Sequence, residues 1–187
     1  DSAFRYGITL RYKDTQGVMK GSDRENLDGS VNLSYRLNKF NFSNQTNIYH
    51  TKADNNTVSF SQFANANPYY AKRDENGEAY KVLESYATYT GTEYVYNPLW
   101  DYEQKSFSGS NQFTFNNNFN VEYSPVKNLR IVGKLGLTVN KDESAAFNSP
   151  YASMFTNTEQ LKRGTYSQTN SKSTNLDGSL LVSYAGS

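Results

Sequence analysis

The sequence contains no cysteine and only one histidine, His50. The lack of cysteine excludes disulfide scaffolds, thiolate metal sites and cysteine nucleophiles, and one histidine leaves few routes to histidine-based catalysis. No apolar run approaches the roughly 20 residues of a membrane-spanning helix. The 19 basic and 18 acidic residues nearly cancel, so the basic surface of a nucleic-acid-binding protein is missing. We therefore expect no nucleic-acid partner and no helical membrane protein. A membrane β-barrel is not excluded, because its strands need apolar residues only at alternate positions.

Aromatic residues, by contrast, are abundant. Hydrophobic residues make up 36% of the chain, below the usual 45–50% or so, yet 15% of it is aromatic, with 16 Tyr and 11 Phe. The deficit is filled by neutral polar residues, chiefly Asn and Ser. A chain this rich in aromatic residues is not typical of intrinsic disorder, and we expect it to fold.

Apolar and polar residues alternate along much of the chain. In the stretch 129–139, for example, Leu135 and Leu137 alternate with Lys134 and Thr138. A period of two places successive side chains on opposite faces of a β-sheet. The apolar face carries no Lys, Arg, Asp or Glu in any such run. The pattern predicts an all-β chain with six strands, in residues 4–12, 27–37, 40–48, 113–123, 129–139 and 176–184.

Strand length and connection length favour one kind of all-β protein. Several runs approach the ~9–11 residues of a bilayer-crossing strand, whereas strands of soluble domains usually have ~5–6. The connections at 37–40 and 124–128 are short and alternate with long ones at 13–25, 54–106 and 141–173. Short turns on one rim and long loops on the other are typical of outer-membrane barrels. We predict an antiparallel up-and-down meander that is part of a transmembrane outer-membrane β-barrel, with lipid on its apolar face and an aqueous lumen on the other. The alternative is a soluble β-sandwich, a carbohydrate-binding or adhesin module.

Aromatic residues support this topology, whereas three polar residues do not fit a lipid-facing apolar side. The aromatic residues expected at the rim with the short turns, where rings favour a membrane interface, are Phe4, Tyr6, Tyr35, Phe40, Phe42, Tyr123 and Tyr184. However, Asn44, Thr46 and Asn117 fall on the lipid-facing phase of their strands, where unsatisfied polar groups are costly. Either a β-bulge shifts the phase there, or the strands extend beyond the bilayer.

Several segments resemble SusC/RagA-type TonB-linked outer-membrane transporters. Residues 16–23 (QGVMKGSD) are similar to a hairpin that recurs in this family. Residues 67–70 (NPYY) with 74–77 (DENG) resemble its first long-loop signature, and residues 96–101 (YNPLWD) resemble the continuation. Residues 119–125 (FNVEYSP), followed by Leu129 and Arg130, are similar to the turn between two of its barrel strands.

The resemblance implies a function for a larger protein. Members of the family import oligosaccharides or peptides across the bacterial outer membrane with a SusD/RagB-type surface lipoprotein, driven by TonB. Six strands are fewer than the 8 that close the smallest known barrel, and no plug domain or TonB-contact segment is recognisable. We therefore expect residues 1–187 to be an internal section of such a barrel, with TonB contact made by a region that is missing here. Outer-membrane lipid would be a further partner.

The candidate site lies in the long connection 54–106. Long loops commonly carry binding residues, and aromatic rings stack on sugar rings while their polar tips bond hydroxyl groups. These rings would contact a glycan or peptide substrate or the lipoprotein; packing within the loop or against the partner is the plainer interpretation. The candidate residues are Tyr69, Tyr70, Tyr94, Tyr96, Trp100 and Tyr102.

No catalytic or metal site is predicted, and no cofactor. Glu84, Glu93, Asp101 and Glu103 could form a glycosidase pair, but two carboxylates occur by chance in almost any chain, so we expect no enzyme. The residues 74–78 (DENGE) offer calcium-type oxygen ligands around a glycine; a plain surface turn is the preferred interpretation. His50 is expected at the outer rim of its strand as a solvated side chain.

Overall fold

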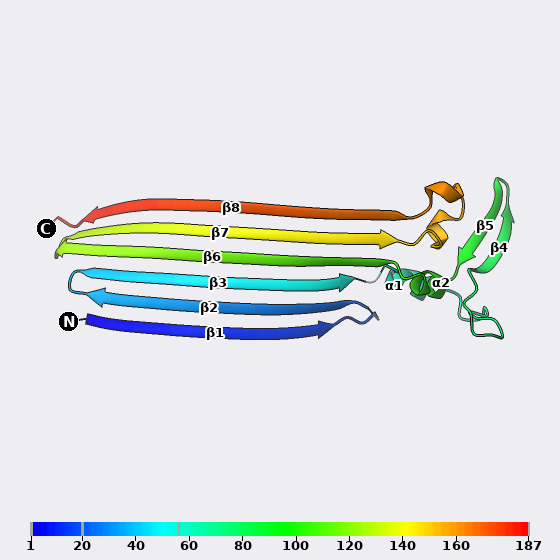
Figure 1. Ribbon diagram of the computed structural model, residues 1–187, viewed down its shortest axis with the longest axis horizontal. Helices are drawn as coiled ribbons and strands as arrows, with labels where there is room; N and C mark the ends of the chain where they lie inside the picture. Colours follow the sequence, from blue (N-terminus) through cyan, green and yellow to red (C-terminus); the bar gives the residue numbers. More distant parts are fainter. Residues whose placement is uncertain (1, 20, 56, 187) are drawn as a thin grey trace.

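The computed structural model describes residues 2–19, 21–55 and 57–186. Asp1, Ser187, and Lys20 and Asn56 from the predicted connections 13–25 and 54–106 lie outside the described residues. One antiparallel sheet of six long strands dominates (Figure 1). Its strands are β1 (Ser2–Gln16), β2 (Asp23–Leu37), β3 (Phe40–Asn55), β6 (Phe107–Val126), β7 (Leu129–Asn148) and β8 (Thr165–Tyr184).

The six strands form a meander in the order β1-β2-β3-β6-β7-β8. Every strand pairs with its sequence neighbours in this series, and every pair is antiparallel. This confirms the predicted antiparallel meander. The sheet is open: within the described residues, β1 and β8 each pair along one edge only, so no closed barrel is present.

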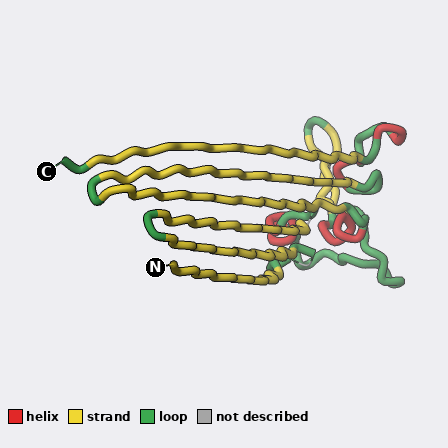
Figure 2. The backbone as a smooth tube through the Cα atoms, turned by 60° about the vertical axis from the view of Figure 1, so that its left-hand side comes forward, coloured by secondary structure: helices red, strands yellow, loops and turns green. Residues whose placement is uncertain are grey.

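Short and long connections lie at opposite ends of the sheet, as their lengths predicted (Figures 1 and 2). The turn end carries Asn38 and Lys39 between β2 and β3, and Lys127 and Asn128 between β6 and β7. The loop end carries connections 17–22, 56–106 and 149–164. The strands extend well into the predicted loops, however: β6, β7 and β8 each have 20 residues.

The longest connection contains further elements that the all-β prediction did not include. They are helix α1 (Phe60–Asn65), the hairpin of β4 (Val82–Thr88) and β5 (Gly91–Tyr96), and helix α2 (Pro98–Glu103). The connection between β7 and β8 contains two 3₁₀ turns, η1 (Ser153–Phe155) and η2 (Gln160–Lys162). No helix among residues 2–19, 21–55 and 57–186 is long and apolar enough to span a membrane.

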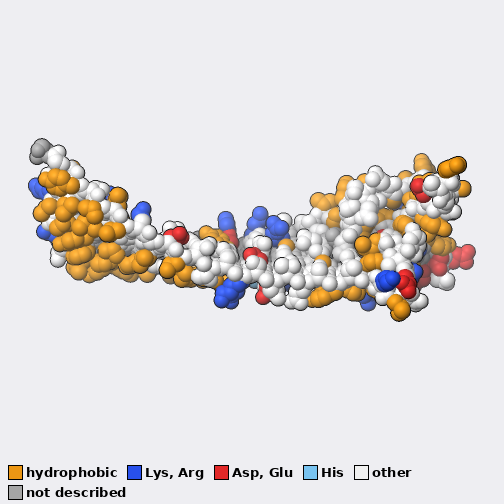
Figure 3. All heavy atoms as spheres, turned by 90° about the horizontal axis from the view of Figure 1, so that it is seen from above, with side chains coloured by type: hydrophobic (Ala, Val, Ile, Leu, Met, Phe, Trp, Pro, Cys, Tyr) orange, Lys and Arg blue, Asp and Glu red, His pale blue; other side chains and the backbone are white. Residues whose placement is uncertain are grey.

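The strand register gives the two faces of the sheet different characters. Partners in the register point to the same side, so Ile8, Val31, Leu137 and Leu176 share one face, which we call the apolar face. The opposite, polar face carries Asn, Ser, Thr and charged side chains. Seen edge-on, hydrophobic side chains gather toward the turn end and again at the loop end, and polar and charged ones dominate the middle (Figure 3).

The sheet is a single layer with no core of its own. Apolar-face residues stay open to solvent: Leu135 is 58% exposed and Leu176 is 77% exposed. The buried hydrophobic residues lie mostly at the loop end, among them Val58, Ala79, Ala152 and Phe155. The conventional core therefore belongs to the loops, while the apolar face of the strands is uncovered.

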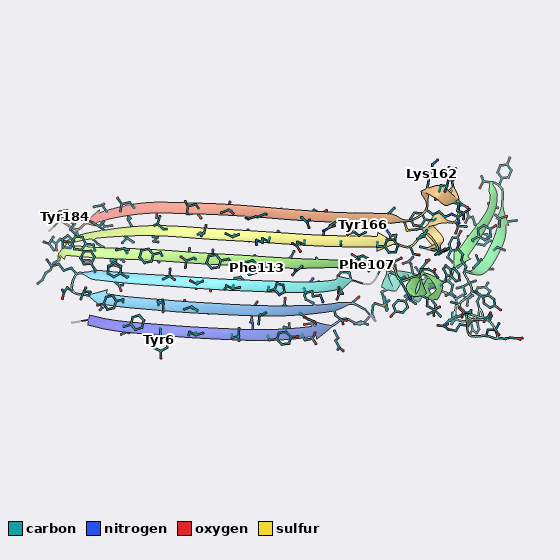
Figure 4. The ribbon with its side chains drawn as sticks, in the orientation of Figure 1. Tyr6, Phe107, Phe113, Lys162, Tyr166 and Tyr184 are labelled. Carbon is teal, nitrogen blue, oxygen red and sulfur yellow. The ribbon has the colours of Figure 1, made fainter. Side chains whose placement is uncertain are left out.

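Aromatic rings mark both ends of the apolar face (Figure 4). At the turn end, successive ring contacts with centroid distances of 4.3–6.5 Å link Tyr6, Phe4, Tyr35, Phe42, Phe40 and Tyr123. These are six of the seven aromatic residues that the sequence predicted at the short turns; the seventh, Tyr184, ends β8 at the same end of the sheet (Figure 4). At the loop end, Phe107 and Phe147 lie 5.8 Å apart, and Phe147 is the register partner of Tyr166.

Candidate functional site

The connection between β3 and β6 is held together by one buried amide. Asn97 is 1% exposed, and its Nδ2 donates to the carbonyl oxygens of Lys72 at 2.9 Å and Tyr80 at 2.7 Å. Its Oδ1 accepts a bond from the Leu99 amide at 3.0 Å, which caps helix α2. Pro98 follows at the first helical position, where a missing N–H costs nothing. Asn97 thus joins the segment before the hairpin to the helix after it.

A second set of contacts ties this unit to the connection between β7 and β8. Asp101 on α2 accepts hydrogen bonds from the Ser153 amide at 2.7 Å and from the Ser153 hydroxyl. The indole Nε1 of Trp100 donates to the Tyr151 carbonyl at 3.1 Å. Together the two connections, residues 57–106 and 149–164, form one structured unit at the loop end, which we call the cap.

The six predicted site residues all lie in the cap but do not form one continuous aromatic stack. Tyr94 and Tyr96 are on β5 with ring centroids 6.2 Å apart. Tyr69 projects alone and is 93% exposed. Trp100, as described above, braces the neighbouring loop, which fits the packing interpretation of its ring. The remaining two are Tyr70, which is half-buried, and Tyr102, which is exposed on α2.

Two tyrosine–carboxylate pairs hold the hairpin side of the cap. The Tyr86 hydroxyl donates to Glu93 Oε2 at 2.8 Å across β4 and β5, and this bond raises the pKa of Tyr86 above 10.0. A hydrogen bond with Glu84 likewise raises the pKa of Tyr70. Each bond therefore favours the neutral tyrosine, which acts as the donor.

These contacts also account for the carboxylates considered as a catalytic pair. Glu84 and Glu93 interact with the two tyrosines, Asp101 with Ser153, and Glu103 forms an ion pair with Arg73. Each carboxylate therefore has a structural partner. In the described part of the chain, no group of three or more His, Asp or Glu side chains is placed to hold a metal ion.

Two further candidates occupy ordinary structural positions. Asp74 Oδ1 accepts from the amides of Asn76 at 2.9 Å and Glu78 at 2.8 Å, which is the geometry of an Asx turn. His50 does not lie at the end of its strand, because β3 continues to Asn55. The expected position at the outer rim was therefore wrong; the His50 side chain is half-buried, with Nε2 2.7 Å from Asn111 Oδ1.

The polar face carries a shallow transverse groove. Hollows of ≈ 430 and ≈ 420 Å³ meet at Gln45 and Asn120. One continues over Gly136 and the other over Gly7, two positions where a side chain is missing from the polar face. Elsewhere on this face, register partners bond to each other, as Asn116 does to Thr138 at 2.8 Å. Amide and hydroxyl side chains line the groove together with the charged side chains of Arg5, Lys134 and Asp177.

The apolar face contains one closed polar cluster. Asn44 and Asn117 exchange amide hydrogen bonds at 3.2 and 3.1 Å, and Asn117 Nδ2 also lies 2.7 Å from Thr46 Oγ1. The register of β3 and β6 runs without a shift through this region, so no bulge changes the phase. The difficulty noted in the sequence is resolved by mutual hydrogen bonding, and the strands also extend beyond the apolar stretch.

The structural roles of Asn97 and Asp101, the two residues that organise the cap, were not predicted from the sequence. Asn97 had a visible signal, since Asn followed by Pro is typical of a helix N-cap and its first turn. The hydrogen bond that Ser153 donates to Asp101 had no such signal, because it joins residues 52 positions apart in two separate loops. No protein-family model and no curated protein matches the chain.

Proposed function

We propose that this chain is a section of the β-barrel of a TonB-dependent outer-membrane nutrient importer of the SusC/RagA type. In this proposal the apolar face meets lipid and the polar face lines an aqueous lumen. The observation that carries it is a single-layer sheet with one uncovered apolar face. A soluble protein rarely leaves so large a contiguous apolar surface exposed, whereas in a bilayer lipid covers it.

The dimensions of the apolar stretch support this assignment. From Leu129 to Val139 it matches the ~9–11 residues that a tilted strand needs to cross the hydrocarbon region. Beyond it, the apolar face of β7 becomes charged, with Lys141 following Val139 in alternation. The row of aromatic rings at the turn end fits an interfacial girdle, and the opposite face is polar, as in a water-filled barrel.

The unpaired edges of the sheet also support a larger assembly. The outer edge of β8, 20 residues long, is unpaired within the described residues and the strand is exposed along its whole length. Free backbone groups on a long edge invite pairing with another strand, and in a bilayer they must be paired. Further strands of the parent barrel would satisfy both β1 and β8.

The cap is the part we assign to capture of an oligosaccharide or peptide, or to docking of a SusD/RagB-like lipoprotein. It stands at the loop end, which in this topology faces outward. Tyr69, Tyr89 and Leu161 project from it almost fully exposed. Tyrosine offers a large contact area with few rotatable bonds, which suits a stacked ligand or a protein interface.

Shortening the hairpin tests the role of the cap in the parent transporter. Ser85 and Tyr94 are register partners, so residues 86–93 can be replaced by Asn-Gly, a favoured two-residue turn. This change leaves Asn97 and its bonds in place. We expect reduced substrate uptake or lipoprotein association with normal barrel assembly. Wild-type values of both would show that the hairpin is only a cover.

Detergent dependence distinguishes the alternative, a soluble β-sandwich that binds carbohydrate. Such a module needs a second sheet over the apolar face, and among the described residues the only other sheet is the two-stranded hairpin of β4 and β5, at the loop end. We expect the chain to stay dispersed in detergent and to aggregate in plain buffer. A monomer in plain buffer would favour the sandwich.

A further inference from the structure

Two lysines lie side by side where the apolar face becomes charged. Lys141 on β7 and Lys172 on β8 are direct register partners, and Phe113 on β6 is the other partner of Lys141. Because Lys141 lies two residues from Val139, both lysines are on the apolar face. In the edge-on view, Lys and Arg side chains lie with Asp and Glu on both sides of the middle of the sheet, next to the hydrophobic side chains of the turn end (Figure 3).

This pair is electrostatically unfavourable as it stands. Like charges directly opposite each other on antiparallel strands destabilise a sheet. Both lysines are exposed, and neither has an ion pair with any described residue. Glu143 lies one row farther from the apolar stretch, opposite Asn111 and Asn170, so its carboxylate does not stand between the two amines.

The other side of the sheet provides an internal comparison. On the same face, Glu25 of β2 and Lys52 of β3 are also register partners. They lie one row beyond the level of Lys141, and there the charges are opposite. The register therefore places opposite charges across from each other where β2 meets β3, and two ammonium groups across from each other where β7 meets β8.

We propose that Lys141 and Lys172 together bind the anionic phosphate of a lipid headgroup at the outer border of the membrane. This inference rests on the proposed function, which places the apolar face in lipid. The hydrocarbon boundary then falls beside Val139, and the next residue on that face is at headgroup depth. Two ammonium groups offer six N–H donors to phosphate oxygens, and the anion removes the repulsion between them.

The test compares binding of the full chain to vesicles of phosphatidylcholine alone and with added lipid A, a phosphorylated lipid. We expect the wild type to prefer lipid A, and Lys141→Gln and Lys172→Gln each to reduce this preference about fivefold. Lys134→Gln is the matched control, because Lys134 is on the same strand but on the polar face. Its preference should equal that of the wild type.

A charge reversal separates headgroup binding from simple strand pairing. Lys141→Glu creates an opposite-charge pair like that of Glu25 and Lys52, so it should stabilise the sheet against urea while abolishing the preference for lipid A. An unchanged preference in the Gln variants would overturn the inference, and so would an equal preference for a carboxylated lipid of the same charge. Failure of the wild type to insert even into phosphatidylcholine would overturn the proposed function as well.

Discussion

Asn44 on β3 and Asn117 on β6 are diagonal neighbours in the register and exchange two amide hydrogen bonds in the middle of the apolar face. The Thr46 hydroxyl joins them, donating to Asn44 Oδ1 at 3.1 Å. In hydrocarbon each of these groups alone would be costly. The three side chains satisfy each other's hydrogen bonds. Loss of one side chain therefore leaves polar groups of the others unpaired.

Replacing one of the two amides should therefore cost more than replacing both. We expect Asn117→Leu to destabilise the folded sheet by about 1–3 kcal/mol, because it leaves the Asn44 Nδ2 group without its acceptor. The double variant Asn44→Leu, Asn117→Leu should recover most of this loss. Urea titrations of the four proteins in a double-mutant cycle measure the coupling. Additive effects would mean that the two amides act independently.

Arginine substitutions on the two faces of β7 should have opposite effects on assembly. Leu135 lies in the apolar stretch between Phe119 and Gly178, and arginine at the midplane of a lipid-facing position costs ~2–4 kcal/mol. Thr138 is on the polar face, so Thr138→Arg sacrifices one hydrogen bond from Asn116, worth roughly 0.5–1.5 kcal/mol. Leu135→Arg should impair assembly into membranes, measured by protease resistance, and Thr138→Arg should not. Equal behaviour would contradict the assigned faces.

The bond between Asp101 and Ser153 should couple the two loops of the cap. Hydrogen bonds to a charged group contribute about 1.5–3 kcal/mol, so Asp101→Ala is expected to release residues 149–164 and speed their amide hydrogen exchange. Glu103→Gln is the control, since its partly exposed ion pair with Arg73 should contribute at most about 1 kcal/mol. Equal exchange in wild type and Asp101→Ala would show that other contacts hold the loop.

The hairpin of the cap should weaken at high pH. The bond to Glu93 raises the pKa of Tyr86 above its ordinary value of 10.0. A raised pKa means that the folded chain favours the neutral tyrosine. The stabilisation is therefore complete below pH 10.0 and is lost as the pH rises through the higher folded pKa. Tyrosinate absorbance of wild type minus Tyr86→Phe reports this titration, and Glu93→Gln should lower its midpoint. An unchanged midpoint would show that the bond does not control the ionisation.

The sequence predicted the meander but not the full length of its strands. Alternation marks β8 only from Leu176 onward, because residues 167–175 are polar on both faces and a period of two carries no signal there. The long strand was formed by pairing with β7, from Asn148 opposite Thr165 onward. Pairing with β7 thus extended β8 over residues that show no alternation of apolar and polar side chains.

The sequence predicted which loop carries the candidate site, but not how the side chains of that loop are arranged. A long loop rich in tyrosine was visible in the sequence, and the Asn97–Pro98 signal for a helix start could be read there. Which tyrosine would be exposed, as Tyr69 is, and which would bond a carboxylate, as Tyr86 does, depends on the hairpin register. Long-range contacts such as that of Asp101 leave no local pattern.

Solvent accessibility along β7 tests the central claim most directly, that one face lies in lipid and the other in water. The chain has no cysteine, so single cysteines can be placed from residue 131 to residue 140 and spin-labelled in vesicles. We predict a period of two, with labels at Leu135, Leu137 and Val139 accessible to oxygen, and labels at Lys134, Thr138 and Asn140 accessible to a water-soluble nickel complex. Access of the nickel complex to both sets would contradict the account.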